Sequence, residues 1–304
     1  FKDFSYGFRP GRSAHQAVEY LFKEVSFNRM RYIIDADLQN YFGSINHGLL
    51  RELLGRRVND GVIRKMVDKW LKAGILEDGQ LTYPKEGTPQ GGVISPLLSN
   101  IYLHYVLDEW FAEQIQPLLS GRSFIVRYAD DFILGFEKKE DVMRVMKVLP
   151  KRFEKYKLNL HPDKTKVVDL FTTFGKGDRS FDFLGFTHYF GKSRNGTPIL
   201  KRKTSRKKFN KAVKQTEEWI KRNRHMKLKE LIKELNVKLT GHYSYYGITF
   251  NSRGINRFYE AVKRILHVWL NRRGGKPIWN WEKFCSLIYV WIPLKSPKIY
   301  HSFV

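Results

Sequence analysis

Two apolar runs that flank a pair of acids decide the fold. They read Phe124-Ile125-Val126-Arg127-Tyr128-Ala129-Asp130-Asp131-Phe132-Ile133-Leu134-Gly135-Phe136. Two β-rich runs joined by about two turn-prone residues predict a tight hairpin with both acids at its tip. Side chains alternate along a strand, so we expect only one of the two acids to point into a site. The pair is either a Mg²⁺-binding element or an acid-rich surface turn, and the rest of the sequence must decide.

The charge of the chain predicts a polyanionic partner. Lysine and arginine number 55 against 30 acids, which gives a net charge of +25. Residues 201–304 hold 25 of these basic residues against 6 glutamates and no aspartate, an excess of 19, which leaves +6 for residues 1–200. Such an excess indicates a nucleic-acid surface in the second part of the chain.

The composition indicates a globular protein in a reducing compartment, and we expect it in the cytoplasm. Hydrophobic residues make up 42% of the 304 residues, and no apolar run approaches the roughly 18 residues of a membrane span. The single Cys285 excludes an internal disulfide framework. The chain begins at Phe1 without a start methionine, and we interpret this as a cut end.

Residues 1–200 mix short strands with helices and lack the regular alternation of a parallel sheet, which predicts an α+β fold. Pro150 should kink or divide the helix that contains it. The predicted strands are 32–34, 124–126, 132–134, 166–168 and 181–186. The predicted helices are 14–25, 62–73, 97–111 and 141–156.

After residue 203 the pattern changes to helix. Three apolar stripes at helical spacing, within 209–220, 228–235 and 255–269, predict a small helical bundle. The exposed face of the first helix is basic and is a candidate nucleic-acid surface. The candidate nucleic-acid contacts on this face are Lys207, Lys211, Lys214 and Arg222.

A second acidic segment follows the strand at 32–34. Asp35 and Asp37 lie two residues apart and share one strand face, so either could point toward the hairpin tip. An acid at the end of one strand and an acid pair on a neighbouring hairpin can hold two Mg²⁺ ions about 3.5–4 Å apart, the geometry of in-line phosphoryl displacement.

Six motif-like blocks follow one another along the first part of the chain, and three more lie in the helical tail. The six blocks are Tyr6 to Ser13, Asp35 to Phe42, Gly87 to Asn100, Tyr128 to Asp131, Leu158 to Lys166 and Phe183 to Phe186. The tail carries Leu235 to Gly247, Val268 to Arg273 and Pro297 to Tyr300. In this order the six blocks closely resemble bacterial group II intron reverse transcriptases, and the tail resembles the maturase or thumb region of that family.

The resemblance implies a role for particular residues. Two Mg²⁺ ions, for which Mn²⁺ is a possible substitute, would be held by Asp37, Asp130 and Asp131. Lys164 would act beside the triphosphate, and Leu38, Phe42 and Gln90 would contact the nucleotide, with Phe42 as a steric gate against ribonucleotides. The hairpin Phe183, Leu184, Gly185 and Phe186 would grip the primer, and Arg9 and Arg12 are either phosphate contacts or structural arginines.

The resemblance also implies a right-hand polymerase palm with an antiparallel sheet, helices and partial fingers, followed by an α-helical thumb/maturase domain. We expect the palm at 1–190, a basic Gly/Lys-rich connection at 191–203 and the helical domain at 204–304. The family has fingers blocks upstream of Phe8, and none is visible here. They were removed, are supplied by another chain, or are lacking in a reduced relative.

The implied function is that of an RNA-dependent DNA polymerase that extends a primer 3′-hydroxyl with dNTPs and binds intron RNA through its basic thumb. The implied partners are an RNA template, a DNA or RNA primer, dNTPs and structured intron RNA. Two alternatives remain: a non-enzymatic RNA-binding maturase, and the same polymerase used in CRISPR spacer acquisition, phage defence or DNA repair.

Overall fold

The computed structural model describes all residues except 29, 73–74, 78–79, 83–85, 89–91, 172–178, 194, 275–277 and 304. The chain divides into two compact units. The first comprises Phe1–Leu184 and Tyr189–Leu200, and the second comprises Gly185–His188 and Lys201–Val304.

A four-stranded antiparallel sheet forms the centre of the first unit, with strand order β4-β5-β1-β6. The strands are β1 (Tyr32–Ala36), β4 (Ser123–Tyr128), β5 (Asp131–Phe136) and β6 (Lys166–Asp169). The register pairs Ile34 of β1 with Leu134 of β5 on one side and with Val167 of β6 on the other. The central strand β1 is therefore fixed along both edges.

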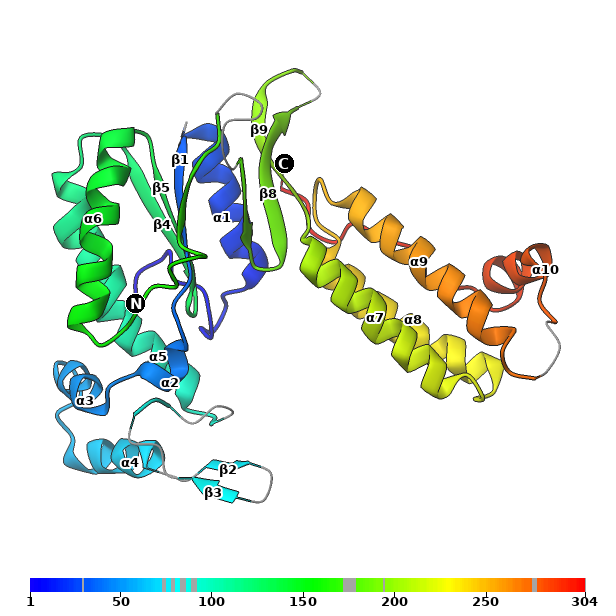
Figure 1. The fold of residues 1–304 in the computed structure, drawn as a ribbon, viewed down its shortest axis with the longest axis horizontal. Coiled ribbons are helices and arrows are strands. Elements are labelled where there is room, and N and C mark those ends of the chain that lie inside the picture. Colours follow the sequence, from blue (N-terminus) through cyan, green and yellow to red (C-terminus); the bar gives the residue numbers. More distant parts are fainter. Residues whose placement is uncertain are drawn as a thin grey trace. The chain divides into compact units, whose positions relative to one another are not determined.

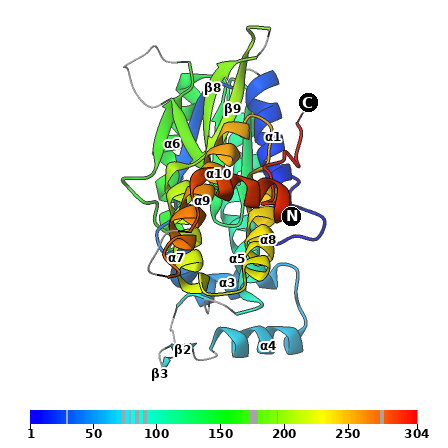
Figure 2. The same cartoon turned by 90° about the vertical axis from the view of Figure 1, so that its right-hand side faces the viewer.

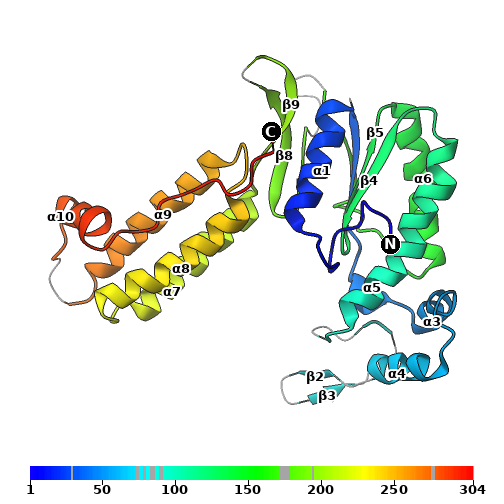
Figure 3. The same cartoon turned by 180° about the vertical axis from the view of Figure 1, so that it is seen from behind.

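Helices cover both faces of this sheet (Figures 1 and 3). On one face α6 (Lys139–Lys155) packs with Ile34, Ile125 and Phe132 in a continuous apolar core. On the other face lies α1 (Ala14–Phe27), which begins with a capping box at Ser13. Alternation along the strands supplies buried side chains to both faces.

The remaining elements of the first unit connect this framework. A helix that starts as α5 (Ser95–Leu103) continues through the π-helical segments η1 (His104–Asp108) and η2 (Trp110–Ile115). The other elements are α2 (Tyr41–Ser44), α3 (His47–Gly55), α4 (Gly61–Leu71), β2 (Ile75–Glu77), β3 (Gln80–Thr82) and the 3₁₀ turn η3 (Gln116–Leu118).

Three further strands, β7 (Ser180–Phe183), β8 (Phe186–Lys192) and β9 (Pro198–Thr204), form a second sheet in the order β7-β8-β9. The predicted strand 181–186 is wrong, because the backbone turns at Leu184 and Gly185, whose φ angles are 51° and 81°. Two consecutive positive φ angles are those of a tight hairpin turn, so this segment is two strands. The predicted connection 191–203 falls on β8, β9 and the turn between them.

The second unit is a helical bundle, which Figure 2 shows nearly end-on. Its long helices are α7 (Arg206–Asn223), α8 (Leu228–Tyr246) and α9 (Ser252–Leu270), followed by α10 (Trp281–Ser286) and the π-helical η4 (Leu287–Trp291). The three predicted stripes meet in one core, in which Ile220, Leu235 and Leu266 are fully buried. No helix among the described residues is long and apolar enough to cross a membrane.

The predicted α+β fold is confirmed, whereas the predicted division of the helix at Pro150 is wrong. Helix α6 runs unbroken from Lys139 to Lys155. Pro150 lies on the exposed face, while Leu149 and Phe153 are buried. Water can therefore solvate the backbone group that the proline leaves unpaired, and the packed face holds the helix together.

Substituting Asn251→Ala should destabilise the helical unit. The buried Asn251 side chain accepts a hydrogen bond from the Thr204 backbone N–H (2.8 Å) and donates to the Thr204 hydroxyl and the Tyr246 carbonyl (both 2.8 Å). Loss of these bonds leaves buried groups unsatisfied, so we expect roughly 1–3 kcal/mol less stability in urea denaturation. Asn256→Ala, at an exposed position of α9, is the matched control, and equal effects in both variants would contradict this role.

Candidate active site

The acid pair lies at the tip of the β4–β5 hairpin. Tyr128 pairs with Asp131, so Ala129 and Asp130 form the turn, and Ala129 has a φ of 57°. The register of β1 against β5 ends with Ala36 opposite Phe132. One step further, Asp37 leaves β1 next to Asp131. Antiparallel pairing thus brings an acid from 93 residues upstream to the hairpin tip.

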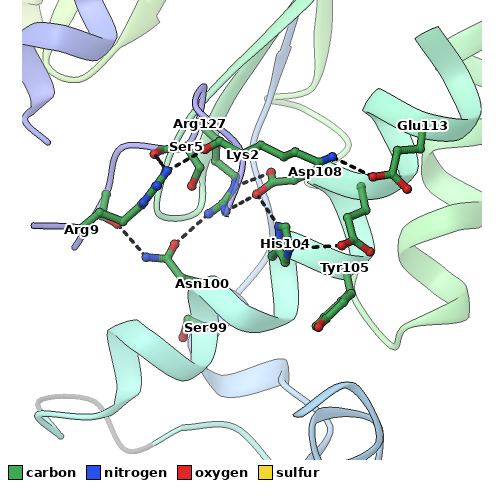
Figure 4. A network of polar contacts seen from close by, with 12 residues as sticks. Lys2, Ser5, Arg9, Ser99, Asn100, His104, Tyr105, Asp108, Glu113 and Arg127 are labelled. Carbon is green, nitrogen blue, oxygen red and sulfur yellow. Dashed lines mark hydrogen bonds and ion pairs between the residues drawn. The ribbon is translucent and has the colours of Figure 1, made fainter. Parts of the chain in front are cut away.

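A buried arginine links this turn to the neighbouring helix, and Figure 4 shows its contacts with Asp108 and Asn100. The guanidinium of Arg127 donates two hydrogen bonds to the Asp108 carboxylate (2.7 and 2.5 Å), and both side chains are fully buried. Arg127 also donates to the Asn100 side-chain oxygen and to the Ala129 carbonyl, both at 2.8 Å. The turn residue with positive φ is therefore linked, through the Arg127 guanidinium, to the helix that runs from α5 into η1.

The N-terminal segment braces the hairpin from the outer edge of β4. The Arg127 backbone exchanges hydrogen bonds with this segment, donating to Phe4 (2.9 Å) and accepting from Tyr6 (2.8 Å). The Gly7 carbonyl accepts a hydrogen bond from Asn100 (2.6 Å). A Cβ atom at Gly7 would lie 2.4 Å from the Ala129 backbone nitrogen, so the close approach requires glycine.

The acids around the tip carry perturbed pKa values. Burial raises the pKa of Asp131 to about 7, against the opposing hydrogen bond from the Leu184 N–H, and Asp35, Asp130 and Asp37 add to the rise. Burial likewise raises the pKa of Asp130, with Asp37 contributing. Burial raises the pKa of Asp35 to about 6, opposed by Lys166. Carboxylates that repel one another in a partly buried site indicate a local deficit of positive charge.

Lys164 supplies one cation at this point. The loop that carries it is anchored by a hydrogen bond from the His161 N–H to the Asp37 carbonyl (2.7 Å). The Lys164 ammonium lies 2.7 Å from the Asp37 carboxylate, and both side chains are about half exposed. The structure thus brings these two predicted residues into contact.

The donor chemistry of the site fits a hard divalent cation, because Asp37, Asp130 and Asp131 offer only carboxylate oxygens. Burial is the main cause of the raised pKa values of Asp130 and Asp131, and the neighbouring carboxylates, whose charge such a cation would neutralise, add to the rise. Among the described residues, however, no three His, Cys, Asp or Glu side chains lie close enough together to hold a metal, so the three carboxylates would have to move closer to share an ion.

Phe42 lies on α2, directly beyond the segment that carries Asp37. Its ring is partly exposed and packs against the buried ring of Tyr41, with centroids 5.3 Å apart. The Phe42 carbonyl accepts a hydrogen bond from the Thr88 N–H (2.7 Å). The Gly87 loop is thereby attached to the predicted gate. Gln90 lies outside the described residues, and the Leu38 side chain is buried, which leaves only its backbone for a nucleotide contact.

The predicted primer grip is a hairpin whose aromatic residues point inward. Phe183 and Phe186 are both buried, and Phe186 stacks on Tyr245 within the helical unit. Of the four predicted residues, only Leu184 and Gly185 are partly exposed. A primer contact made by side chains of these four residues would therefore come from the turn.

The predicted phosphate-binding arginines near the N-terminus are engaged within the chain. Arg9 donates hydrogen bonds to the carbonyls of Lys2 and Ser5 (both 2.6 Å), and Arg12 pairs with Asp3 (2.8 Å). These contacts favour the structural role that the sequence left open for both residues.

By contrast, the predicted basic residues of α7 are all exposed. Their helical spacing places them on one face of this helix. They are Lys207, Lys211, Lys214 and Arg222.

Sequence reasoning missed a second basic surface on α9. Arg253, Arg257 and Arg264 line a groove of about 600 Å³ that also includes Phe209 of α7. Among the described residues, none of these arginines forms an ion pair. Their spacing of four and seven residues places them on one helix face and was the available signal.

The palm sheet with an acid-bearing hairpin defines the class of a nucleic-acid polymerase, and comparisons with known proteins agree. Residues 1–188 match the family "Reverse transcriptase (RNA-dependent DNA polymerase)". Residues 206–284 match "Group II intron, maturase-specific domain". The chain therefore belongs to the group II intron reverse transcriptase/maturase family, with a reverse transcriptase palm followed by a helical domain.

Relatives include Protein YkfC of Escherichia coli K12, 36% identical over 199 residues, which cover 55% of this chain and 52% of the relative. The group II intron-encoded protein LtrA of Lactococcus lactis is 42% identical over 104 residues, 34% of this chain and 17% of that protein. The chain thus spans about half or less of the length of these relatives. A telomerase structure from Candida tropicalis aligns with 65% of this chain and 40% of that one, at 16% identity and a TM-score of 0.49.

Substituting Asp108→Asn should strongly destabilise the palm, because it leaves the buried Arg127 guanidinium without its counter-ion. We expect a loss of roughly 3–5 kcal/mol in urea denaturation at pH 7. Glu113→Gln, which breaks the exposed pair with Lys2, is the matched control and should change little. A small effect of Asp108→Asn would show that the ion pair does not support the hairpin.

The destabilisation caused by Asp108→Asn should depend on pH. Burial alone would raise the pKa of Asp108, but the ion pair with Arg127 outweighs it and lowers the pKa. This stabilisation is fully present above the unfolded pKa of about 4 and is lost as the pH falls through the lower folded value. The stability difference between wild type and Asp108→Asn should therefore shrink below pH 4. A difference that stays constant to pH 2 would contradict the assignment.

Proposed function

We propose that the chain is an RNA-directed DNA polymerase that extends a primer 3′-hydroxyl with deoxynucleotides on an RNA template. The observation that carries the proposal is the β1–β5 register, which brings Asp37 to the Asp130–Asp131 tip in a chain of the reverse transcriptase family. Three carboxylates at the ends of adjoining strands and in the turn between two of them are the donor set that two-metal nucleotidyl transfer needs.

In this proposal, Asp37, Asp130 and Asp131 hold two Mg²⁺ ions, which Mn²⁺ could replace. When bound, these ions would lower the pKa of the primer hydroxyl and neutralise charge on the phosphates. Lys164 contributes a further positive charge, which its half-exposed ammonium can direct to Asp37 or to an incoming triphosphate. The Phe42 ring excludes a ribose 2′-hydroxyl, and the basic helical unit holds RNA through its phosphates.

A second function, that of an RNA-binding maturase, is favoured by the match of residues 206–284 to the maturase-specific domain and by the exposed lysines of α7. The two functions use different units, so one chain can perform both. Use of the polymerase in CRISPR spacer acquisition, phage defence or DNA repair would require the same active site, so the site does not distinguish these uses.

Substituting Asp130→Ala should abolish primer extension on an RNA template with Mg²⁺. Loss of a ligand that stabilises charge by several kcal/mol should lower the rate at least about 100-fold, since about 1.4 kcal/mol corresponds to tenfold. Asp163→Ala removes an exposed acid near Lys164 and is the matched control.

Unchanged extension by Asp130→Ala would reject the metal-site assignment. If the wild-type chain binds structured RNA but does not extend a primer, the polymerase function would be rejected and the maturase function would remain as the proposal. RNA binding by Asp130→Ala should equal that of wild type, because the basic surface belongs to the other unit.

Substituting Phe42→Ala should increase ribonucleotide incorporation, because it removes the ring that would exclude the 2′-hydroxyl. We expect discrimination between dNTP and rNTP to fall by at least tenfold, which corresponds to about 1.4 kcal/mol, in single-nucleotide extension. Phe27→Ala, at an exposed position of α1, should leave discrimination unchanged. Equal discrimination by wild type and Phe42→Ala would reject the gate.

A further inference from the structure

A hollow on the helical unit is lined by aromatic rings and polar side chains together. It lies between α7 and α8, has a volume of about 270 Å³ and reaches down to α9. Flat rings, an amide, a hydroxyl and one cation meet in it. These side chains are Gln215, Thr216, Trp219, Lys238, His242 and Phe258.

The floor of the hollow consists of two stacked rings. His242 lies on the buried Phe258 ring with centroids 3.7 Å apart and planes at 18°. Burial lowers the pKa of His242 to about 4, so the imidazole is neutral at physiological pH. In the part of the chain that the structure describes, its buried Nε2 has no hydrogen-bond partner. Because Nε2 is shielded from water, a ligand would reach it only after the imidazole shifted, and a polar edge placed there would then remove the penalty of the unsatisfied atom.

The rim combines an aromatic wall with polar groups. The partly exposed ring of Trp219 faces the Lys238 ammonium, which lies 4.9 Å from the ring centroid. The Gln215 side chain, one helical turn away on α7, is exposed and offers both donors and an acceptor. An aromatic wall, an amide and a cation match a nucleotide, whose base stacks, whose edge forms hydrogen bonds and whose phosphate pairs with lysine.

We propose that this hollow receives one unpaired nucleotide of a bound RNA, with its base against Trp219 and its polar edge toward His242 and Gln215. The inference rests on the proposed RNA binding by the helical unit, and all of the lining residues lie within the match to the maturase-specific domain. The volume is just below the roughly 300–1,000 Å³ of pockets for drug-sized ligands, which suits a single base.

The test compares two RNA duplexes of equal length, one fully paired and one with a single bulged 2-aminopurine, by fluorescence anisotropy with the full chain. Stacking contributes about 1–3 kcal/mol per base, so wild type should prefer the bulged RNA roughly 5- to 150-fold. Binding should also change the 2-aminopurine fluorescence. Neither readout requires polymerase activity.

Three variants examine the lining. Trp219→Ala should remove the preference, and thermal melting will show whether it remains folded. His242→Phe keeps a ring on Phe258 but removes Nε2, and Gln215→Ala changes an exposed side chain, so both should lower the preference without unfolding the bundle. Lys233→Ala, an exposed lysine elsewhere on α8, is the matched control and should keep the preference.

Equal binding of paired and bulged RNA by wild type would overturn the proposal, as would a full preference in folded Trp219→Ala and His242→Phe variants. Equal competition by a bulged DNA duplex would overturn the assignment to RNA. Failure of wild type to extend a primer would contradict the proposed polymerase function and leave the bulge preference intact.

Discussion

The buried Arg127–Asp108 ion pair is the interaction on which the rest of the palm depends. A guanidinium in a dry interior is tolerated only if its hydrogen bonds are satisfied, and Arg127 finds its partners in Asp108, Asn100 and the Ala129 carbonyl. These partners belong to the long helix and to the turn itself. The hydrogen bonds that satisfy Arg127 therefore also fix the hairpin tip against the helix, and this determines where Asp130 and Asp131 lie.

Much of this arrangement could be predicted from the sequence, because local patterns report which residues lie on one face. Alternation located the β4–β5 hairpin, and the spacing of Asp35 and Asp37 identified the second acidic strand. The partner of Arg127 could not be predicted in this way. Asp108 lies 19 residues upstream in an apolar helix, and periodicity indicates burial without indicating which buried groups meet.

Local sequence patterns also could not predict backbone conformations that a residue type disfavours. The segment Phe181–Phe186 has the composition of one strand, yet its backbone reverses at Leu184, a non-glycine residue with a φ of 51°. The Leu184 N–H donates to the Asp131 carboxylate (3.3 Å). This turn therefore borders the candidate site, and the contact with Asp131 gives a physical reason for its strained backbone. The sequence of the segment alone does not reveal that contact.

The electrostatics of the site follow from unequal neutralisation of its acids. Lys164 pairs with Asp37 at the solvent-exposed side, whereas burial keeps the pKa values of Asp130 and Asp131 raised. The cluster of carboxylates therefore costs folding energy that the lysine offsets only in part. Lys164 contacts one oxygen of the Asp37 carboxylate, so a divalent cation bound by Asp37 would compete with the ammonium for this side chain. In the proposed function, an ammonium released in this way would be free to pair with an incoming triphosphate, so this ion pair would couple the proposed metal ligands to the proposed nucleotide contact.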